Sequence, residues 1–382
     1  MARSLERLFL LCECLSLHPR GGQIEGLRDR LSGTDALWQA IIQLATSAYL
    51  GPALWVALGQ KDLRDLLPDD AVDFLGDSFR LNELRNENIR AEAVALLRAA
   101  NIAGLVPLLL KGGGHLFVPY SPLIQGRMMG DLDIVAEPGT VKRLALVFQD
   151  MGYEVMRDQE PWSHSYLHLS RKGAIATIDL HHDVGKQRHV LPIEAAFSAA
   201  TMIHHDDVTL RLLMPTHQVL FNIFHAAVQD RTYKLGRLPL RSLRDLSCLA
   251  EEYGSEIDWR QVRGSMHENG YGGAFGSYLY QAHRLFGFPV PPGLTLSWGA
   301  RLHFKWCLLL RRRRFLRRAI EIWATVTHPF ERAHFEYAYG RSSGVLHRQL
   351  RRARLGWSIL VKHKGGLFKK FIKEYNDMYR SS

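Results

Sequence analysis

The sequence has no long uninterrupted hydrophobic run. Its 382 residues contain only short apolar stretches such as 102–110 and 306–310, far below the roughly 18–20 residues of a membrane-spanning helix. There are only 4 cysteines, and their spacing fits neither a zinc site nor a disulfide framework. Glycine and proline number 32 and 15 without a repeat, which excludes collagen-like and low-complexity chains. The N-terminus also lacks a signal-peptide pattern, and we predict a soluble, cytoplasmic protein.

Acidic residues are scarce in the last quarter of the chain. Residues 293–382 contain 20 lysines and arginines but only 5 acidic residues, whereas residues 1–292 contain 29 and 33. The net charge of +11 therefore comes from the C-terminal region alone. We expect this region to have a different task from the rest of the chain.

The hydrophobic pattern divides the chain into four segments. Residues 1–100 show helical spacing of leucine and alanine, which predicts an N-terminal helical lobe. Short apolar runs and glycine turns over residues 101–214 predict strand–strand–helix–strand–strand, a small mixed sheet. Helical spacing returns over residues 215–288, and a proline-rich linker precedes a basic helical region, 293–382. The expected fold class is α+β, with a small mixed β-sheet domain flanked by N- and C-terminal helical segments.

Three aspartates stand out in the sheet region. Asp131 and Asp133 alternate with a leucine on one expected strand, so both carboxylates should point to one face. Asp179 and His181 share the polar face of a later strand. Three carboxylates that converge repel one another unless divalent cations lie between them, and oxygen ligands select Mg²⁺ or Mn²⁺. For Asp131 and Asp133 alone, a solvated edge strand is the alternative.

Three consecutive glycines precede the aspartates. Lys111 is followed by Gly112, Gly113 and a third glycine at the end of an apolar run. Such a turn lets backbone N–H groups approach a phosphate, and Lys111 and Arg127 would add positive charge. A glycine run is also common in flexible loops. The order of strand, glycine turn, arginine, paired aspartates and later aspartate is a more specific signal than any one part.

This order of motifs resembles the nucleotidyltransferase superfamily typified by DNA polymerase beta. More narrowly, it resembles a bacterial nucleotidyltransferase family often labelled uncharacterised. The resemblance covers roughly residues 85–290 and rests on segments 110–113, 127–135, 152–153 and 178–181. The 16-residue stretch 115–130 is longer than the usual superfamily spacing but similar to this narrower family.

The resemblance implies a catalytic domain over residues 101–214 that moves an NMP group from an NTP to a hydroxyl or phosphate of a small molecule, sugar or protein. Mg²⁺ or Mn²⁺ would be the cofactor. The residues implied as both catalytic and metal-binding are Asp131, Asp133 and Asp179. Those implied as nucleotide-binding are Lys111, Gly112, Gly113 and Arg127. The alternatives are a non-catalytic binding or antitoxin-like module of the same fold, and a membrane-associated accessory protein of a biosynthetic complex.

Two histidines are candidates for the acceptor side of such a site. His181 shares the face of Asp179 and would orient it or contact the acceptor, and a hydrogen-bonded histidine without a catalytic role is the alternative. His217 lies on an expected helix, two turns before His225, where packing is the alternative.

The basic region 293–382 mixes arginines and lysines with tryptophan, phenylalanine and leucine. This composition suits an anionic membrane surface, which would place the protein at the inner face of the membrane. An acidic protein partner, the rest of this chain, or helices that are simply solvated fit the same composition. Nucleic acid is a weaker alternative, because no RNA-binding motif accompanies the charge.

Overall fold

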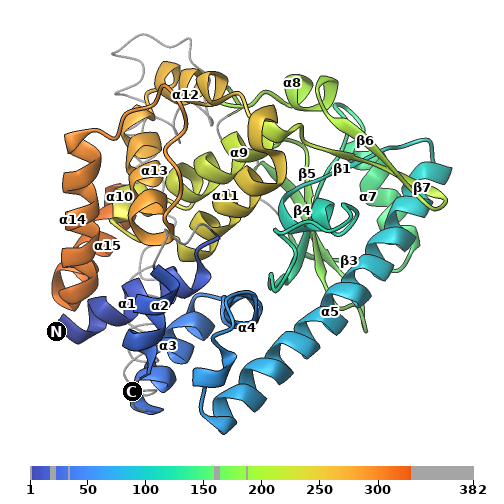
Figure 1. Ribbon diagram of the computed structural model, residues 1–382. Helices are drawn as coiled ribbons and strands as arrows, with labels where there is room; N and C mark the ends of the chain where they lie inside the picture. Colours follow the sequence, from blue (N-terminus) through green and yellow to red (C-terminus); the bar gives the residue numbers. More distant parts are fainter. Residues whose placement is uncertain (1, 18–22, 33–34, 159–163, 186–187, 328–382) are drawn as a thin grey trace, which may run out of the picture. The chain divides into compact units, whose positions relative to one another are not determined.

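A seven-stranded mixed sheet holds the central part of the chain (Figure 1). The computed structural model describes residues 2–17, 23–32, 35–158, 164–185 and 188–327. The strand order is β3-β4-β5-β2-β1-β7-β6. Strands β1 and β7 are parallel, as are β2 and β5, and the remaining neighbours are antiparallel. The expected α+β class with a mixed sheet is confirmed.

The sheet has more strands than the sequence pattern predicts. The strands are β1 Leu108–Leu109, β2 Asp131–Val135, β3 Glu154–Asp158, β4 Ser165–Ser170, β5 Thr177–His181, β6 Thr201–His205 and β7 Val208–Leu212. The prediction missed β3 and the β6–β7 hairpin. Strands β3 and β6 are sheet edges whose described side chains are mostly exposed and show no clear apolar alternation. Strand β7 does alternate, with Val208, Leu210 and Leu212 buried, so its pattern carried a strand signal. Strand β1 is only two residues long, because the apolar run 102–110 begins inside a helix.

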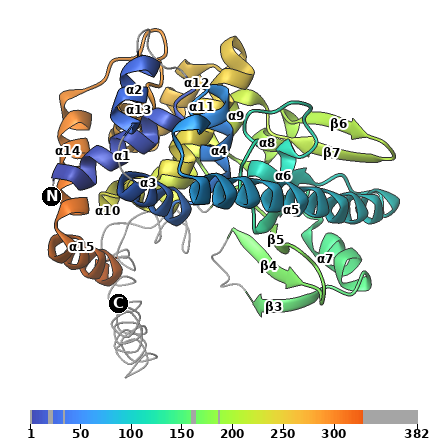
Figure 2. The same ribbon diagram turned by 60° about the horizontal axis from the view of Figure 1, so that its bottom comes forward.

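Helices precede the sheet, as the sequence predicts. They are α1 Ala2–Leu15, α2 Gln23–Leu31, α3 Asp35–Ser47, α4 Gly51–Gln60, the short 3₁₀ helix η1 Arg64–Leu66 and α5 Asp69–Ile102. Helix α5 has 34 residues. Its C-terminal half packs on a face of the sheet, where Ile89 and Leu96 share a hydrophobic core with Leu132 of β2. Figure 2 shows the helix crossing in front of the sheet, whereas its N-terminal half extends beyond the sheet in both views (Figures 1 and 2). Shorter helices lie between the strands: α6 Lys111–His115, α7 Val141–Asp150 and α8 Ile193–Ser198.

Polar side chains at three levels along α5 form hydrogen bonds with the backbone of loops and strands of the sheet region. The amides of Asn82 and Asn86 both donate to the carbonyl oxygen of Arg127, at 3.1 and 3.0 Å. A carboxylate oxygen of Glu92 accepts from two backbone N–H groups just before β5, at 3.1 and 3.3 Å. Asn101 exchanges two hydrogen bonds with the backbone of β7, at 2.9 and 2.7 Å. Helix α5 therefore fixes the segments that enter β2, β5 and β7 relative to one another.

A second group of helices follows the sheet. They are α9 Pro215–Phe224, the π-helix η2 His225–Gln229, α10 Thr232–Leu235, α11 Leu240–Tyr253, the 3₁₀ helix η3 Gly254–Glu256, α12 Trp259–Glu268, α13 Gly272–Phe286, α14 Trp298–Arg312 and α15 Arg314–Thr327. The first compact unit of the chain ends at Arg317. Within the described residues, no helix is both long enough and apolar enough to cross a membrane.

Strand β2 separates two hydrophobic cores. Leu132 and Ile134 belong to the core that contains residues of α5 and α7, whereas Val135 belongs to the core formed mainly by the N- and C-terminal helices. Because side chains alternate along a strand, Asp133 lies on the same face of β2 as Val135. The fold therefore turns the acidic face of the sheet toward the helical part of the protein.

Candidate active site

Two of the three aspartates lie side by side on neighbouring strands. Strands β2 and β5 run parallel, and their register pairs Asp133 with Asp179. Paired residues of adjacent strands point to the same face of the sheet. Asp133 is 5% exposed, and Asp179 is half-buried. The structure thus brings two carboxylates together in a sheltered position, as the alternation of both strands predicts.

His181 joins this acidic pair. Its Nε2 lies 3.3 Å from Oδ1 of Asp133 and 3.5 Å from Oδ2 of Asp179. One ligand atom from each of the three residues lies within 4.8 Å of the other two, so the group could hold a metal ion. The other ring nitrogen, Nδ1, is buried and has no hydrogen-bond partner in the part of the chain that the structure describes, and the ring stacks on His164. The sequence suggested an acceptor-side role for His181, whereas its geometry makes it a candidate ligand.

Lys111 places a positive charge on the acidic pair. Its Nζ donates to Oδ1 of Asp133 at 2.7 Å. Burial raises the pKa of Asp133, but the nearby Lys111 and His181 outweigh this effect and hold the pKa well below its usual range. Asp133 is therefore ionised at neutral pH, and Lys111 is its present counter-ion.

Asp131 does not join the group. It is exposed, and its register partner on β5 is Thr177. Its carboxylate makes no hydrogen bond or ion pair to any residue that the structure describes. The resemblance implies that Asp131 binds metal together with Asp133 and Asp179, and this role of Asp131 stays a prediction.

Two residues of β4 support Asp179 and were not singled out from the sequence. The hydroxyl of Ser165 donates to Oδ1 of Asp179. Nε2 of His168 lies 3.4 Å from the same oxygen, because His168 is the register partner of Asp179. Alternation alone gives no signal for this pair, because Ser165 and His168 would lie on opposite faces of a regular strand. A register shift between Ser165 and Leu167 lets both contact Asp179.

The three glycines form a helix and not the turn that the sequence suggested. Residues 111–115 are the short helix α6, and the left-handed backbone conformation falls on Lys111, with φ of 51°. A Cβ at Gly112 would come within 2.3 Å of the guanidinium of Arg127, and one at Gly114 within 2.3 Å of Leu212. The glycines are therefore required by close packing between α6 and its neighbours, whatever else they bind.

Arg127 is fixed by a buried ion pair. Its guanidinium donates to Oδ2 of Asp245 on α11 at 3.1 and 3.2 Å, and both side chains are less than a tenth exposed. The resemblance implies a nucleotide-binding role for Arg127, and the sequence alone indicates for Asp245 an ion pair within its helix or between helices. The structure instead joins the two across 118 residues of chain.

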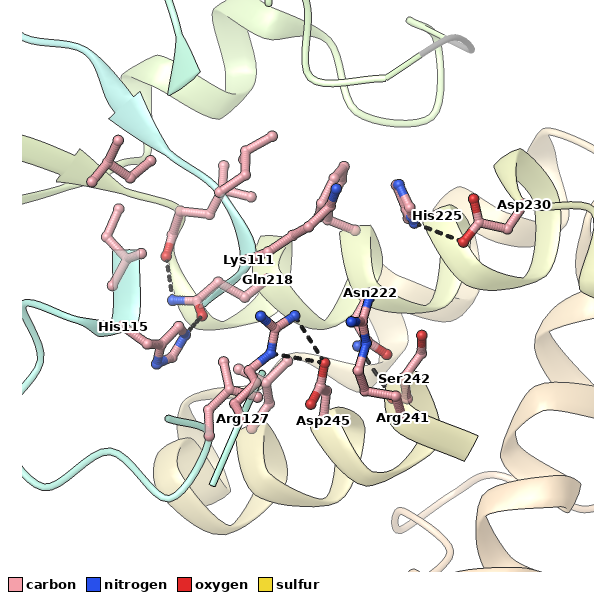
Figure 3. Close-up of a pocket in the computed structure, with 17 residues that line it drawn as sticks. Lys111, His115, Arg127, Gln218, Asn222, His225, Asp230, Arg241, Ser242 and Asp245 are labelled. Atoms are coloured by element: carbon pink, nitrogen blue, oxygen red, sulfur yellow. Dashed lines mark hydrogen bonds and ion pairs between the residues drawn. The ribbon is translucent and has the colours of Figure 1, made fainter. Parts of the chain in front are cut away.

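A cavity of about 90 Å³ with both polar and apolar lining residues lies beside Lys111 (Figure 3). Both Lys111 and Arg127 line it, facing α9, η2 and α11. The polar lining residues from that side are Gln218, Asn222, His225, Asp230, Arg241, Ser242 and Asp245. Burial raises the pKa of Asp230, but His225, Lys111 and Arg241 outweigh it and lower the pKa below its usual value. The volume is well under the roughly 300–1,000 Å³ of most small-molecule sites, so the cavity can take only part of a nucleotide.

Comparison with known proteins identifies the family. Residues 34–287 match the family described as uncharacterised nucleotidyltransferase. The chain belongs to this family. The match includes the Asp133–Asp179 pair, helix α6 and every residue that lines the cavity. A search of the curated proteins found no match.

In this nucleotidyltransferase family member, a buried hydrogen-bond network ties α6 to the helical region. His115, the last residue of α6, faces Oε1 of Gln218 through Nε2 at 2.7 Å and Ser121 through Nδ1 at 2.9 Å. The Gln218 amide donates to the Leu213 carbonyl, so its oxygen must accept from His115. Ser121 donates its hydroxyl proton to Glu252 on α11, and Nδ1 of His115 lies 3.4 Å from Oε1 of the same carboxylate. The network thus joins α6 to both α9 and α11.

His217 lies apart from these groups. It is buried on α9, is not among the residues that line the cavity, and its Nδ1 has no hydrogen-bond partner within the described residues. Burial lowers the pKa of its imidazole. Its acceptor-side role stays a prediction.

Proposed function

We propose that the protein is a divalent-metal-dependent enzyme that transfers a nucleoside monophosphate from an NTP to a hydroxyl or phosphate of an acceptor. Family membership supports the reaction class. The observation that carries the proposal is the convergence of Asp133, Asp179 and His181 within 4.8 Å on the sheet face that is turned toward the helices.

The donor set fits a divalent cation. Asp133 and Asp179 offer carboxylate oxygens, and Asp133 is ionised at neutral pH because its pKa is lowered. Oxygen ligands suit Mg²⁺ and Mn²⁺, and the imidazole of His181 shifts the preference toward Mn²⁺. Asp131 would complete the set from the exposed end of β2, as the resemblance implies. When bound, the ion would neutralise phosphate charge in the transition state.

The residues of the chain would position both reactants. In the reaction, an acceptor oxygen bonds to the α-phosphorus of the NTP, the bond from that phosphorus to the β-phosphate oxygen breaks, and pyrophosphate leaves. Where the acceptor is a hydroxyl, Asp179 would take its proton, with Ser165 and His168 holding one carboxylate oxygen. His181 would offer its Nε2 to the same ion from beside both carboxylates.

The phosphates would lie on the α6 side of the acidic pair. Gly112 and Gly113 follow Lys111 in α6 and, as the resemblance implies, would offer backbone N–H groups to the phosphates. The Lys111 ammonium, which pairs with Asp133, would bind a phosphate oxygen when the carboxylate of Asp133 holds a metal ion. Arg127 lines the same cavity, and its guanidinium is ion-paired with the Asp245 carboxylate.

The test measures metal binding and turnover separately. Mn²⁺ binding is followed by electron paramagnetic resonance, and pyrophosphate release is measured with each of the four NTPs. Asp133→Asn and Asp179→Asn should lose both, because each removes a charged ligand. Asp150→Asn, an exposed aspartate at the end of α7, is the matched control and should change neither.

Full metal binding and turnover in Asp133→Asn would refute the proposal. Binding of Mn²⁺ and NTP by the wild type with no turnover of any NTP would instead favour a non-catalytic binding module.

A further inference from the structure

Helix α14 is anchored to the protein by one face only. Ala300, Phe304, Cys307 and Leu310 are buried and follow one another at helical spacing, and the helix packs along α13. His303 adds two polar contacts, at 2.6 Å to the hydroxyl of Ser277 and at 2.8 Å to the backbone carbonyl of α10 residue 233. The orientation of α14 within the first compact unit is therefore fixed (Figures 1 and 2).

The opposite face of α14 exposes large apolar side chains. Trp298, Leu302, Trp306 and Leu309 are 73%, 42%, 39% and 41% exposed. Their spacing of four, four and three residues places them in one row along the helix. Single exposed apolar residues need no explanation, but a continuous aromatic and aliphatic row marks an interaction surface.

Exposed basic side chains border this apolar row. Arg301, Lys305 and Arg312 are exposed on the same helix. None of them has an ion-pair partner among the described residues. The sequence has no acidic residue from position 293 to position 320. This outward face, defined by these seven residues, thus combines apolar area with an unopposed cationic border.

We propose that the outward face of α14 docks on an anionic lipid surface. An amphipathic helix with tryptophan and leucine between basic residues lies in the headgroup layer, where its apolar row enters the acyl boundary and its cations meet lipid phosphates. Tryptophan is enriched at that depth. The inference is independent of the proposed reaction, because it uses no residue of the candidate active site.

Two other occupants fit the face less well. A single-stranded nucleic acid would use the cations and the two tryptophans, but base stacking gives no role to Leu302 and Leu309. A second copy of the chain, docked through the same face about a two-fold axis, would set like charges against one another. A lipid surface uses the aromatic, aliphatic and basic residues together.

The experiment uses the full chain and vesicles of phosphatidylcholine, with or without phosphatidylglycerol. The double variant Arg301→Glu/Lys305→Glu reverses two charges beside the row. The control Arg260→Glu/Arg263→Glu makes the same change of net charge on two exposed residues of α12. A second variant, Trp298→Ser/Leu302→Ser, removes apolar area and leaves every charge. Circular dichroism melting of each variant checks the fold.

We expect the wild type to cosediment with anionic vesicles at low salt and to bind neutral vesicles weakly. The α14 charge variant should bind at least about 30-fold more weakly, from about 1 kcal/mol for each basic residue lost near the surface. The apolar variant should lose the binding that persists at high salt, and the α12 control should match the wild type.

The proposal is overturned if both α14 variants bind anionic vesicles as tightly as the wild type, which would assign binding to another segment. It is also overturned if the wild type binds single-stranded RNA more tightly than anionic vesicles at equal ionic strength.

Discussion

The buried ion pair of Arg127 and Asp245 allows a direct test, because the sequence suggests that the arginine binds phosphate, whereas the structure places it in an ion pair. Both side chains are less than a tenth exposed, and two hydrogen bonds join them. Removing one partner of a buried ion pair leaves the other charge unpaired and costs about 3–5 kcal/mol. Arg127→Met and Asp245→Leu should therefore each lower the free energy of unfolding by about that amount.

The double variant separates stability from ligand binding. Arg127→Met/Asp245→Leu leaves no unpaired charge, so it should be more stable than either single variant, and a double-mutant cycle should give a favourable coupling energy. Urea unfolding measures the stabilities, and calorimetry with an NTP measures affinity on the folded protein. If Arg127→Met is as stable as the wild type but loses NTP affinity, the ion pair is dispensable and Arg127 is primarily a phosphate ligand.

Three further predictions follow from single sites. Gly114→Ala should lower stability by about 1–3 kcal/mol, because its Cβ would meet Leu212 and the Leu109 carbonyl, whereas Gly130→Ala, with open space around its Cβ, should be neutral in the same thermal melt. Burial raises the pKa of Glu252, but hydrogen bonds from His115 and Ser121 outweigh it and lower the pKa. The stabilisation is therefore present above the ordinary pKa of a glutamate and is lost as the pH falls through the lowered pKa of Glu252, so the stability gap between wild type and Glu252→Gln should close in acid. Mn²⁺ should raise the melting temperature of the wild type and leave that of Asp179→Asn unchanged.

The sequence predicted the parts of the site that depend on local periodicity. Alternation along two strands set Asp133 and Asp179 each on a polar face, and a parallel pairing of those strands then aligned them. To predict His181 as a metal ligand, the register between β2 and β5 would also have been needed.

The remaining features depend on contacts between distant segments. The partner of Arg127 lies 118 residues away, and no local pattern connects it to Asp245. Nothing in the sequence around Lys111 indicates that its ammonium pairs with Asp133 and not with a phosphate. The edge strands β3 and β6 escaped prediction because exposed strands carry no apolar alternation.

The polar contacts of α5 limit where the chain can change length. From one continuous helix, Asn82 and Asn86 hold the loop before β2, Glu92 holds the start of β5 and Asn101 holds β7. One inserted residue turns everything after it by about 100° and moves it by about 1.5 Å along the axis. An insertion between Asn86 and Glu92 would therefore release the start of β5 from the loop that precedes β2, and Asp179 would lose its alignment with Asp133 although neither residue had changed.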